Sequence, residues 1–258
     1  MTLHTTNEQR TAEYLKKFDR ERTLKHLVTG ARPTILDVGA NVGSTLDEFK
    51  RWWPNSVVHC FEPQEECWPE LDARAAKFPR GEAVINRYAV GSTVTDNATF
   101  YSHDITNAQS GFHKINLGSL DSVHLQHLKE EAPAEVESYE RSINQERTMK
   151  IARLDEYLAV AGIGRIDILK MDTQGYEPEV LEGMGARLGD VDVVISELMF
   201  YDYYERSLSF SDLERWLHPA GLRLYDISHI AKNPMNGRTD WVDVVYVHER
   251  LRGHAASA

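Results

Sequence analysis

Four acidic side chains stand at or near the ends of apolar runs that are typical of buried strands. They are Asp37, Glu62, Asp172 and Glu197. In a doubly wound α/β sheet, ligands bind beyond the carboxyl ends of the parallel strands, so we expect these residues to gather around one ligand site. Carboxylates placed there could accept hydrogen bonds from hydroxyls, take up a proton, or bind a hard divalent cation.

The stretch 34–45, TILDVGANVGST, predicts a buried strand, a glycine turn and the first turn of a helix. Gly39 and Gly43 let the backbone turn sharply and, together with Ala40, would let a ligand approach closely. A dinucleotide site needs another glycine where Asn41 stands. Asp37 would repel a pyrophosphate but attract a ligand that carries an ammonium and a sulfonium, as S-adenosylmethionine does and NAD does not. The alternative is that Asp37 only caps the turn and that this corner binds nothing.

The second strand, 57–61, is followed by Glu62 and Pro63. An acid at this point of the fold binds ribose hydroxyls, and the proline gives the chain a fixed exit. The third strand and its exit loop span 83–91. The small apolar residue Ala89 there predicts that an adenine would be held by packing and backbone groups.

Asp172, at the end of the strand 166–172, is the principal catalytic candidate. It would take the proton of an acceptor hydroxyl, or hold a cation such as Mg²⁺ with Glu197 as second ligand. Alternatively, Asp172 only caps the Gly175 turn. For the metal, the absence of a bound cation is favoured over its presence. Lys170 could pair with Asp172 and keep it ionised. His229, just past the sixth strand, is a further candidate base because imidazole titrates near neutral pH, although a loop histidine is more often simply exposed.

The remaining pattern predicts the elements that must position these side chains. Further strands are expected at 191–197, 222–227 and 240–247, with 151–161 as a helix. Only a loop joins the last two strands, which predicts an antiparallel hairpin on an otherwise parallel sheet. The expected fold is α/β, a Rossmann-like class I methyltransferase sheet of seven strands with helices on both faces and an antiparallel last strand.

The domain organisation follows from shifts in composition. We expect an N-terminal helical cap at 1–30, a methyltransferase domain at 31–250 and a tail at 251–258. The polar, charged segment at about 100–148 is too long for a simple connection and predicts a lid or substrate-binding insertion. The N-terminal segment could cover the active site or form a subunit contact, so a homo-oligomer is an alternative to a monomer.

Composition excludes several classes of partner. A net charge of −11 argues against a nucleic-acid substrate, because binding to phosphates needs a basic surface. The two cysteines, Cys60 and Cys67, predict reduced thiols in a cytoplasmic protein. No apolar run approaches the length of a membrane span and no signal peptide opens the chain, so no membrane partner is expected.

Taken together, these segments resemble the FkbM family of S-adenosylmethionine-dependent methyltransferases. The most specific pieces are DVGANVG at 37–43, FEP at 61–63, RLDEY at 153–157 and ILKMDTQGYEPEVLEG at 168–183. The resemblance covers about 34–247 and implies transfer of a methyl group to oxygen, with a sugar, glycan or natural-product hydroxyl as acceptor. It also implies that 37–43 and Glu62 bind the donor, and that Asp172 and Glu177 belong to the active site.

Two alternatives to an O-methyltransferase stay open from the sequence. One is a nicotinamide-dependent oxidoreductase on a similar sheet, which Asn41 disfavours. The other is a non-catalytic protein that binds an adenosyl ligand. The charged segment 121–147 is not part of the resemblance, so the choice of a small-molecule or glycoside acceptor is left open.

Overall fold

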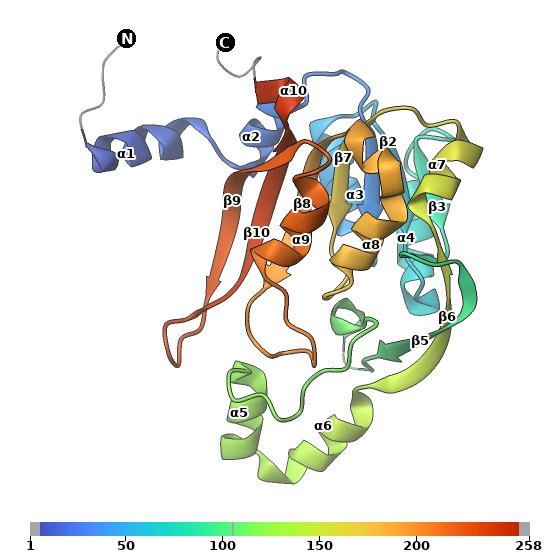
Figure 1. Ribbon diagram of the computed structural model, residues 1–258. Coiled ribbons are helices and arrows are strands. Elements are labelled where there is room, and N and C mark those ends of the chain that lie inside the picture. Colours follow the sequence, from blue (N-terminus) through green and yellow to red (C-terminus); the bar gives the residue numbers. More distant parts are fainter. Residues whose placement is uncertain (1–5, 105, 253–258) are drawn as a thin grey trace.

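The centre of the computed structural model, which describes residues 6–104 and 106–252, is a seven-stranded sheet (Figure 1). The strand order is β3-β2-β1-β7-β8-β10-β9. The strands are β1 (Thr34–Val38), β2 (Val57–Phe61), β3 (Ala83–Asn86), β7 (Ile166–Met171), β8 (Val191–Met199), β9 (Leu222–Lys232) and β10 (Thr239–His248).

Strand β1 lies in the middle because it can be buried on both of its faces. Ile35, Leu36 and Val38 are at most 2% exposed, and β1 pairs in parallel with β2 on one side and with β7 on the other. Strand β10 runs antiparallel to both β8 and β9. The predicted seven-stranded, mostly parallel sheet with an antiparallel final hairpin is therefore confirmed.

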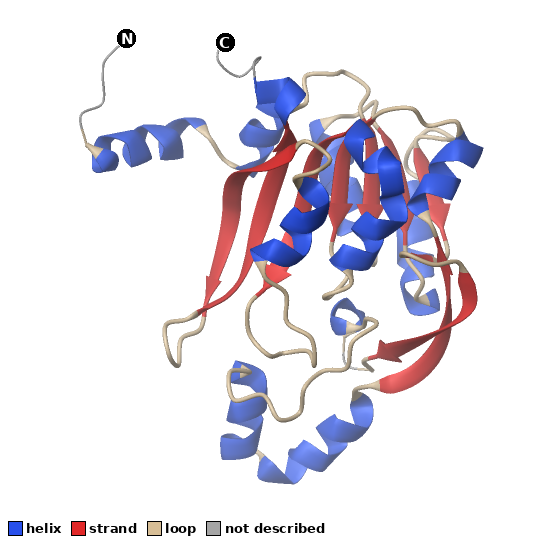
Figure 2. Cartoon of the chain, viewed as in Figure 1, coloured by secondary structure: helices blue, strands red, loops and turns tan. Residues whose placement is uncertain are grey.

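Helices cover both faces of this sheet (Figure 2). One face packs on α2 (Arg20–Leu27), α3 (Ser44–Trp52) and α4 (Trp68–Ala75), and the other on α7 (Leu154–Ala161), α8 (Glu177–Met184) and α9 (Phe210–Leu217). Neighbouring residues of β1 point to opposite faces of the sheet. Ile35 packs in the core beneath α2, α3 and α4, and Leu36 packs in the core beneath α7, α8 and α9. A short helix, α10 (Glu249–Arg252), follows β10.

The segment between β3 and α7 forms a second, smaller sheet and two helices. Its strands are β4 (Ala89–Val90), β5 (Thr95–Ser102) and β6 (Gln145–Ala152), and between β5 and β6 lie α5 (Val123–Glu131) and α6 (Val136–Ser142). In Figure 1 these helices lie beyond the sheet edge, at the bottom of the view. The predicted insertion is thus an ordered unit of secondary structure, and its role as a lid stays a prediction.

One element prediction was wrong in this region and another was incomplete. The expected third strand is present as β3, but its expected exit loop contains β4, which pairs in the smaller sheet because the chain turns between Asn86 and Ala89. The expected helix at 151–161 begins only at Leu154, since Ile151 and Ala152 pair with β4 and β5. A local apolar pattern does not reveal that a distant strand competes for the same backbone.

The N-terminal segment contains α1 (Asn7–Lys17) before α2. Helix α1 buries none of its residues, whereas Leu24 and Leu27 of α2 enter the core beside α3. The beginning of the predicted cap and most of the predicted tail lie outside the described residues. No helix within 6–104 and 106–252 combines the length and the apolar character needed to cross a bilayer.

Candidate active site

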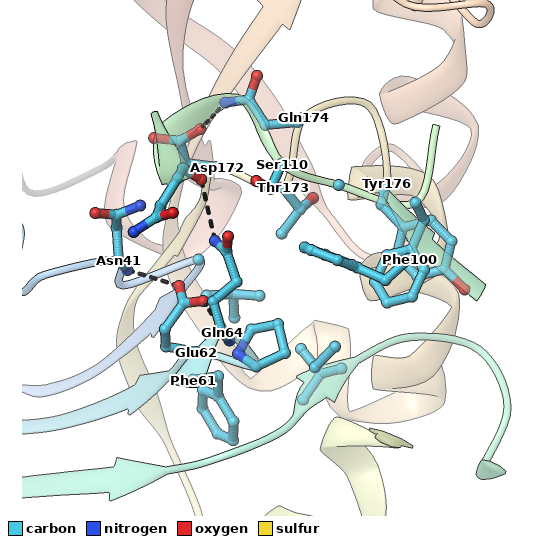
Figure 3. A pocket seen from close by; sticks show the side chains of 18 of the residues that line it. Asn41, Phe61, Glu62, Gln64, Phe100, Ser110, Asp172, Thr173, Gln174 and Tyr176 are labelled. Carbon is cyan, nitrogen blue, oxygen red and sulfur yellow. Dashed lines mark hydrogen bonds between the residues drawn. The ribbon is translucent and has the colours of Figure 1, made fainter. Parts of the chain in front are cut away.

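A cavity lies at the carboxyl ends of β1, β2 and β7, and the space within it, including the part open to solvent, is about 620 Å³ (Figure 3). Its polar lining includes Asn41, Glu62, Gln64, Asp172 and Gln174. Its apolar lining comes from the sheet and the insertion: Val38, Phe61, Pro63, Ala89, Val90, Phe100, Phe112 and Tyr176. Four of the expected strand-end and turn residues, Asn41, Glu62, Pro63 and Asp172, are therefore brought together here, along with Gly39 and Ala89.

The glycine turn brings β1 against the residue that follows β7. Gly39 has a φ of +79°, and a Cβ at this position would lie 1.9 Å from the backbone oxygen of Asp172. Asn41 is also left-handed, with a φ of +48°, a conformation that asparagine tolerates better than most residues. Only a glycine at 39 permits this approach, so the turn fixes Asp172 beside the cavity.

Glu62 is held by the turn and lines the cavity. Its Oε2 accepts a hydrogen bond from the Asn41 N–H and its Oε1 accepts one from the Gln64 N–H, both at 2.8 Å. Burial raises the pKa of Glu62, and these backbone hydrogen bonds oppose that rise. A carboxylate oxygen can accept two hydrogen bonds, so each keeps capacity for one more donor, as the two hydroxyls of a ribose require.

Three residues predicted to bind the donor do not line this cavity. Asp37 is fully buried, Ala40 is 3% exposed and its N–H donates to the Phe61 carbonyl, and a Cβ on Gly43 would meet the Leu71 and Arg74 side chains. Gly43 instead precedes α3 as its N-cap with a φ of +88°. These residues are therefore part of the turn but not of the cavity wall, and Gly39 and Asn41 are the residues of the turn that line the cavity.

Asp37 instead forms a buried ion pair with Lys170. The Lys170 Nζ lies 3.3 Å from Asp37 Oδ1 and 3.6 Å from Asp172 Oδ2, and it donates to the Gly39 carbonyl at 3.3 Å. Burial lowers the pKa of Lys170, but the two carboxylates raise it by more, so its pKa lies above the ordinary value. Lys170 is thus a fixed positive charge between Asp37 in the core and Asp172 at the cavity, which agrees with the expected pairing of Lys170 with Asp172.

Asp172 is the acid with the freest access. Its side chain is 39% exposed, and its Oδ1 accepts a hydrogen bond from the Gln174 side-chain amide at 2.7 Å. The oxygen of the same side-chain amide, Gln174 Oε1, accepts a hydrogen bond from the Tyr204 hydroxyl at 2.6 Å. The turn after β7 therefore holds one oxygen of Asp172 and leaves the carboxylate reachable from the cavity.

Glu177 and Glu197 lie deeper than the sequence suggested. Glu177 Oε1 accepts from the Thr173 N–H at 2.8 Å and from the Thr173 hydroxyl at 3.0 Å, so Glu177 holds the turn that carries Asp172. Both glutamates line a small space of about 260 Å³ beside Tyr204. In the described part of the chain, no three His, Cys, Asp or Glu side chains form a group that could hold a metal ion, so a divalent cation gains no support.

The partly buried Glu197 predicts a pH dependence of stability. Burial, with help from the nearby Asp172, Glu177 and Asp243, raises the pKa of Glu197 to about 9. A raised pKa means that the folded protein binds the Glu197 proton more tightly than the unfolded chain does. The stability that this protonation contributes is fully present below the unfolded pKa near 4.5 and is lost as the pH rises towards 9. For Glu197→Gln, the free energy of unfolding relative to the wild type should rise by up to about 1.4 kcal/mol per pH unit between pH 5 and 8. Urea unfolding at several pH values measures this, and a constant difference would contradict it.

His229 lies inside β9, not past its end, which corrects the sequence prediction. It pairs with Asp243 of β10, its ring stacks on Trp241 at 4.7 Å, and it is exposed. It lines none of the cavities described in this section. The strand is longer than expected because β10 continues to pair with it, so His229 has no support as a base.

Sequence reasoning missed the wall that the insertion contributes. Phe100, Ser110 and Phe112 line the cavity, and Phe112 packs against Tyr176 with ring centroids 4.3 Å apart. Gln64 also donates from its side chain to the Asn107 carbonyl at 3.0 Å, which ties the end of β2 to the insertion. The Ser-, Asn- and Gly-rich composition of 107–120 was the available signal, but it does not say which residues face the site.

Tyr203 and Tyr204 belong to a third core, between the insertion and the loop after β8. They pack with Ile115, Leu125 and Tyr139, and the Tyr204 hydroxyl, which donates to the Gln174 side chain, also lies 3.0 Å from the Gln109 carbonyl oxygen. Packing, rather than contact with an acceptor, accounts for these two tyrosines. Through Gln174 the same cluster connects the insertion to Asp172.

Comparison with known proteins identifies relatives of this chain. Residues 37–224 match the methyltransferase FkbM domain. The chain is also similar to the 2-O-methyltransferase NoeI of Sinorhizobium fredii, with 24% identity over 194 residues and 72% of each chain covered.

Solved structures with similar folds are more distant. M. capricolum TrmK in complex with S-adenosyl-homocysteine shares 9% identity, with a TM-score of 0.46 over 89% of this chain and 68% of that one. The 1,6-didemethyltoxoflavin-N1-methyltransferase of Burkholderia thailandensis shares 12%, with a TM-score of 0.42 over 96% and 92%. The domain match spans most of the sheet and every residue that positions Asp172. This chain therefore belongs to the methyltransferase FkbM domain family.

Proposed function

We propose that the protein transfers a methyl group from S-adenosylmethionine to a hydroxyl oxygen of a sugar-containing small molecule, glycan or natural product. The observation that supports S-adenosylmethionine as the donor is the geometry of Glu62 on the wall of the cavity. Each of its two oxygens accepts one hydrogen bond from a backbone N–H at 2.8 Å. The family supports methyl transfer, and the similarity to the 2-O-methyltransferase NoeI supports oxygen as the acceptor atom.

The cavity residues fit an adenosyl ligand by their chemistry. Glu62 would bind ribose hydroxyls, and the apolar wall of Phe61, Ala89 and Val90 would pack on a purine. Asp172 adds a second carboxylate, which favours a cationic ligand and disfavours a pyrophosphate. When bound, the donor would supply an electrophilic methyl group attached to a sulfonium.

The chain itself would position the acceptor and remove one proton. Asp172 is the reachable base, with one oxygen held by Gln174 and a fixed charge supplied by Lys170. Glu177 is a positioning residue, because it holds Thr173 beside Asp172. Alignment of the two reactants supplies much of the rate enhancement for such a transfer, so a rigid turn matters as much as the base.

Calorimetric titration separates this proposal from its alternatives. We expect S-adenosylhomocysteine to bind and NAD to give no heat, whereas tight NAD binding alone would favour an oxidoreductase. Transfer of a labelled methyl group to a panel of hydroxyl compounds then distinguishes an enzyme from a non-catalytic binding protein. Binding without transfer to any compound would favour the latter.

Glu62→Gln should weaken donor binding and also cost about 1–3 kcal/mol of stability, because the side-chain NH₂ cannot accept the hydrogen bond that one of the Asn41 and Gln64 N–H groups donates in the wild type. The amide retains the shape of the side chain but loses the charge and one acceptor oxygen, and a hydrogen bond to a charged group contributes about 1.5–3 kcal/mol. The dissociation constant for S-adenosylhomocysteine should therefore rise at least about tenfold. Glu70→Gln, on the exposed side of α4, is a matched control that should bind as the wild type does. A change below about twofold at Glu62 would contradict its assignment to the ribose.

A further inference from the structure

A second cavity of about 550 Å³ meets the first at Asp172. It lies over the ends of β7, β8 and β10, and among the described residues Asp172 is the one that lines both spaces. Its other walls are Lys170, Ser196, Glu197, Trp241 and Asp243 from the sheet, with Thr45 and Glu48 from α3 and Arg20 from α2. The candidate base thus borders both spaces, and a methyl transfer would require the donor methyl group and the acceptor hydroxyl to meet beside Asp172.

The lining of this cavity combines an aromatic ring with oxygen acceptors. Trp241 begins the inner part of β10 opposite Met199, and Asp243 follows two residues later opposite Glu197. Residues two apart on a strand share one face, so the indole and the carboxylate act on the same space. An indole packs on the C–H groups of a sugar ring, and carboxylates accept hydrogen bonds from its hydroxyls.

The charge of the cavity selects among sugars. Three carboxylates (Glu48, Asp172 and Asp243) line it against two cations, Arg20 and Lys170, and Glu197, whose pKa is raised to about 9, adds a fourth acid that is protonated at neutral pH. Both cations already face acids: Arg20 Nη1 lies 3.6 Å from Asp243, and Lys170 bridges Asp37 and Asp172. The acidic groups left over would repel a phosphate or a uronic acid.

We propose that this second cavity is the acceptor site and that it takes an uncharged pyranoside sugar, with Trp241, whose ring also stacks on His229, as the aromatic platform and Asp243 as a hydroxyl acceptor. This inference rests on the proposed methyl transfer and specifies the substrate class and the place where it binds. Because Arg20 comes from α2 and lies 3.6 Å from Asp243, helix α2 would shape acceptor choice in the same site.

Saturation-transfer NMR on the full chain with excess S-adenosylhomocysteine tests the site. The probes are methyl α-D-glucopyranoside, the corresponding mannoside and galactoside, and methyl α-D-glucuronide. We expect signal transfer to at least one neutral glycoside and none to the glucuronide. Trp241→Ala should weaken that binding at least about tenfold, as expected for loss of a stacking aromatic, while Trp241→Phe stays within about threefold. Tyr225→Ala, an exposed aromatic change on the adjacent β9, should bind as the wild type does.

The outcomes separate this inference from the proposed function. Absence of S-adenosylhomocysteine binding would overturn the methyltransferase proposal itself. Donor binding with no neutral glycoside bound, with preferential glucuronide binding, or with equal binding by Trp241→Ala would overturn the acceptor site alone. Donor affinity measured for each variant by calorimetry should stay within about twofold of the wild type, which also shows that the variant is folded.

Discussion

Lys170→Met is expected to destabilise the protein by about 3–5 kcal/mol, the usual result of removing one partner of a buried ion pair. Asp37 is fully buried, and neither of its oxygens has a hydrogen bond within the described structure. Lys170, 3.3 Å away, is the cation that compensates its charge. Without it, burial would drive the pKa of Asp37, already raised, further upward. Urea unfolding at pH 7 measures the loss.

A double-mutant cycle shows whether the loss arises from this pair. In Asp37→Asn with Lys170→Met the buried charge is gone, so the double variant should be more stable than the sum of the two single changes predicts. Lys50→Met provides a comparison, since Lys50 is a second buried lysine whose partner Glu82 is partly exposed. Additive effects at 37 and 170, or a loss below about 1 kcal/mol for Lys170→Met, would show that the pair does not hold the strands together.

Asp172→Asn should lower the turnover rate by about 10²–10⁴-fold, the range typical of removing a general base. Asparagine has the same shape and can still accept the hydrogen bond from Gln174, so the turn should persist. What it loses is the capacity to take the acceptor proton. Methyl transfer to a glycoside identified by the binding experiment measures the rate, and calorimetry with S-adenosylhomocysteine measures donor affinity separately.

The pH profile decides between a base and a merely structural acid. If Asp172 takes the proton, the residual rate of Asp172→Asn should increase with pH, because hydroxide can replace the missing base. Asp226→Asn, on β9 and away from both cavities, serves as the control and should keep the wild-type rate. A rate for Asp172→Asn within about fivefold of the wild type would restrict Asp172 to positioning.

The sequence by itself determined the frame of this protein. The apolar run of β1 requires burial on both faces, and the acids and glycines around it placed a ligand site at the strand ends. Glu62 and Asp172 were found in this way because carboxyl ends of parallel strands converge on one edge. The loop between the last strands also predicted their antiparallel pairing.

Only the tertiary structure decided what each acid faces. Asp37 looked like a donor ligand, but it pairs in register with Lys170 on the neighbouring strand and is sealed in the core. Likewise, β5 and β6 pair across more than forty residues, and Trp241 of β10 lines the same cavity as Asp172 although β8 lies between β10 and β7. Such contacts depend on register and on long-range pairing, which a local pattern of residue types does not encode.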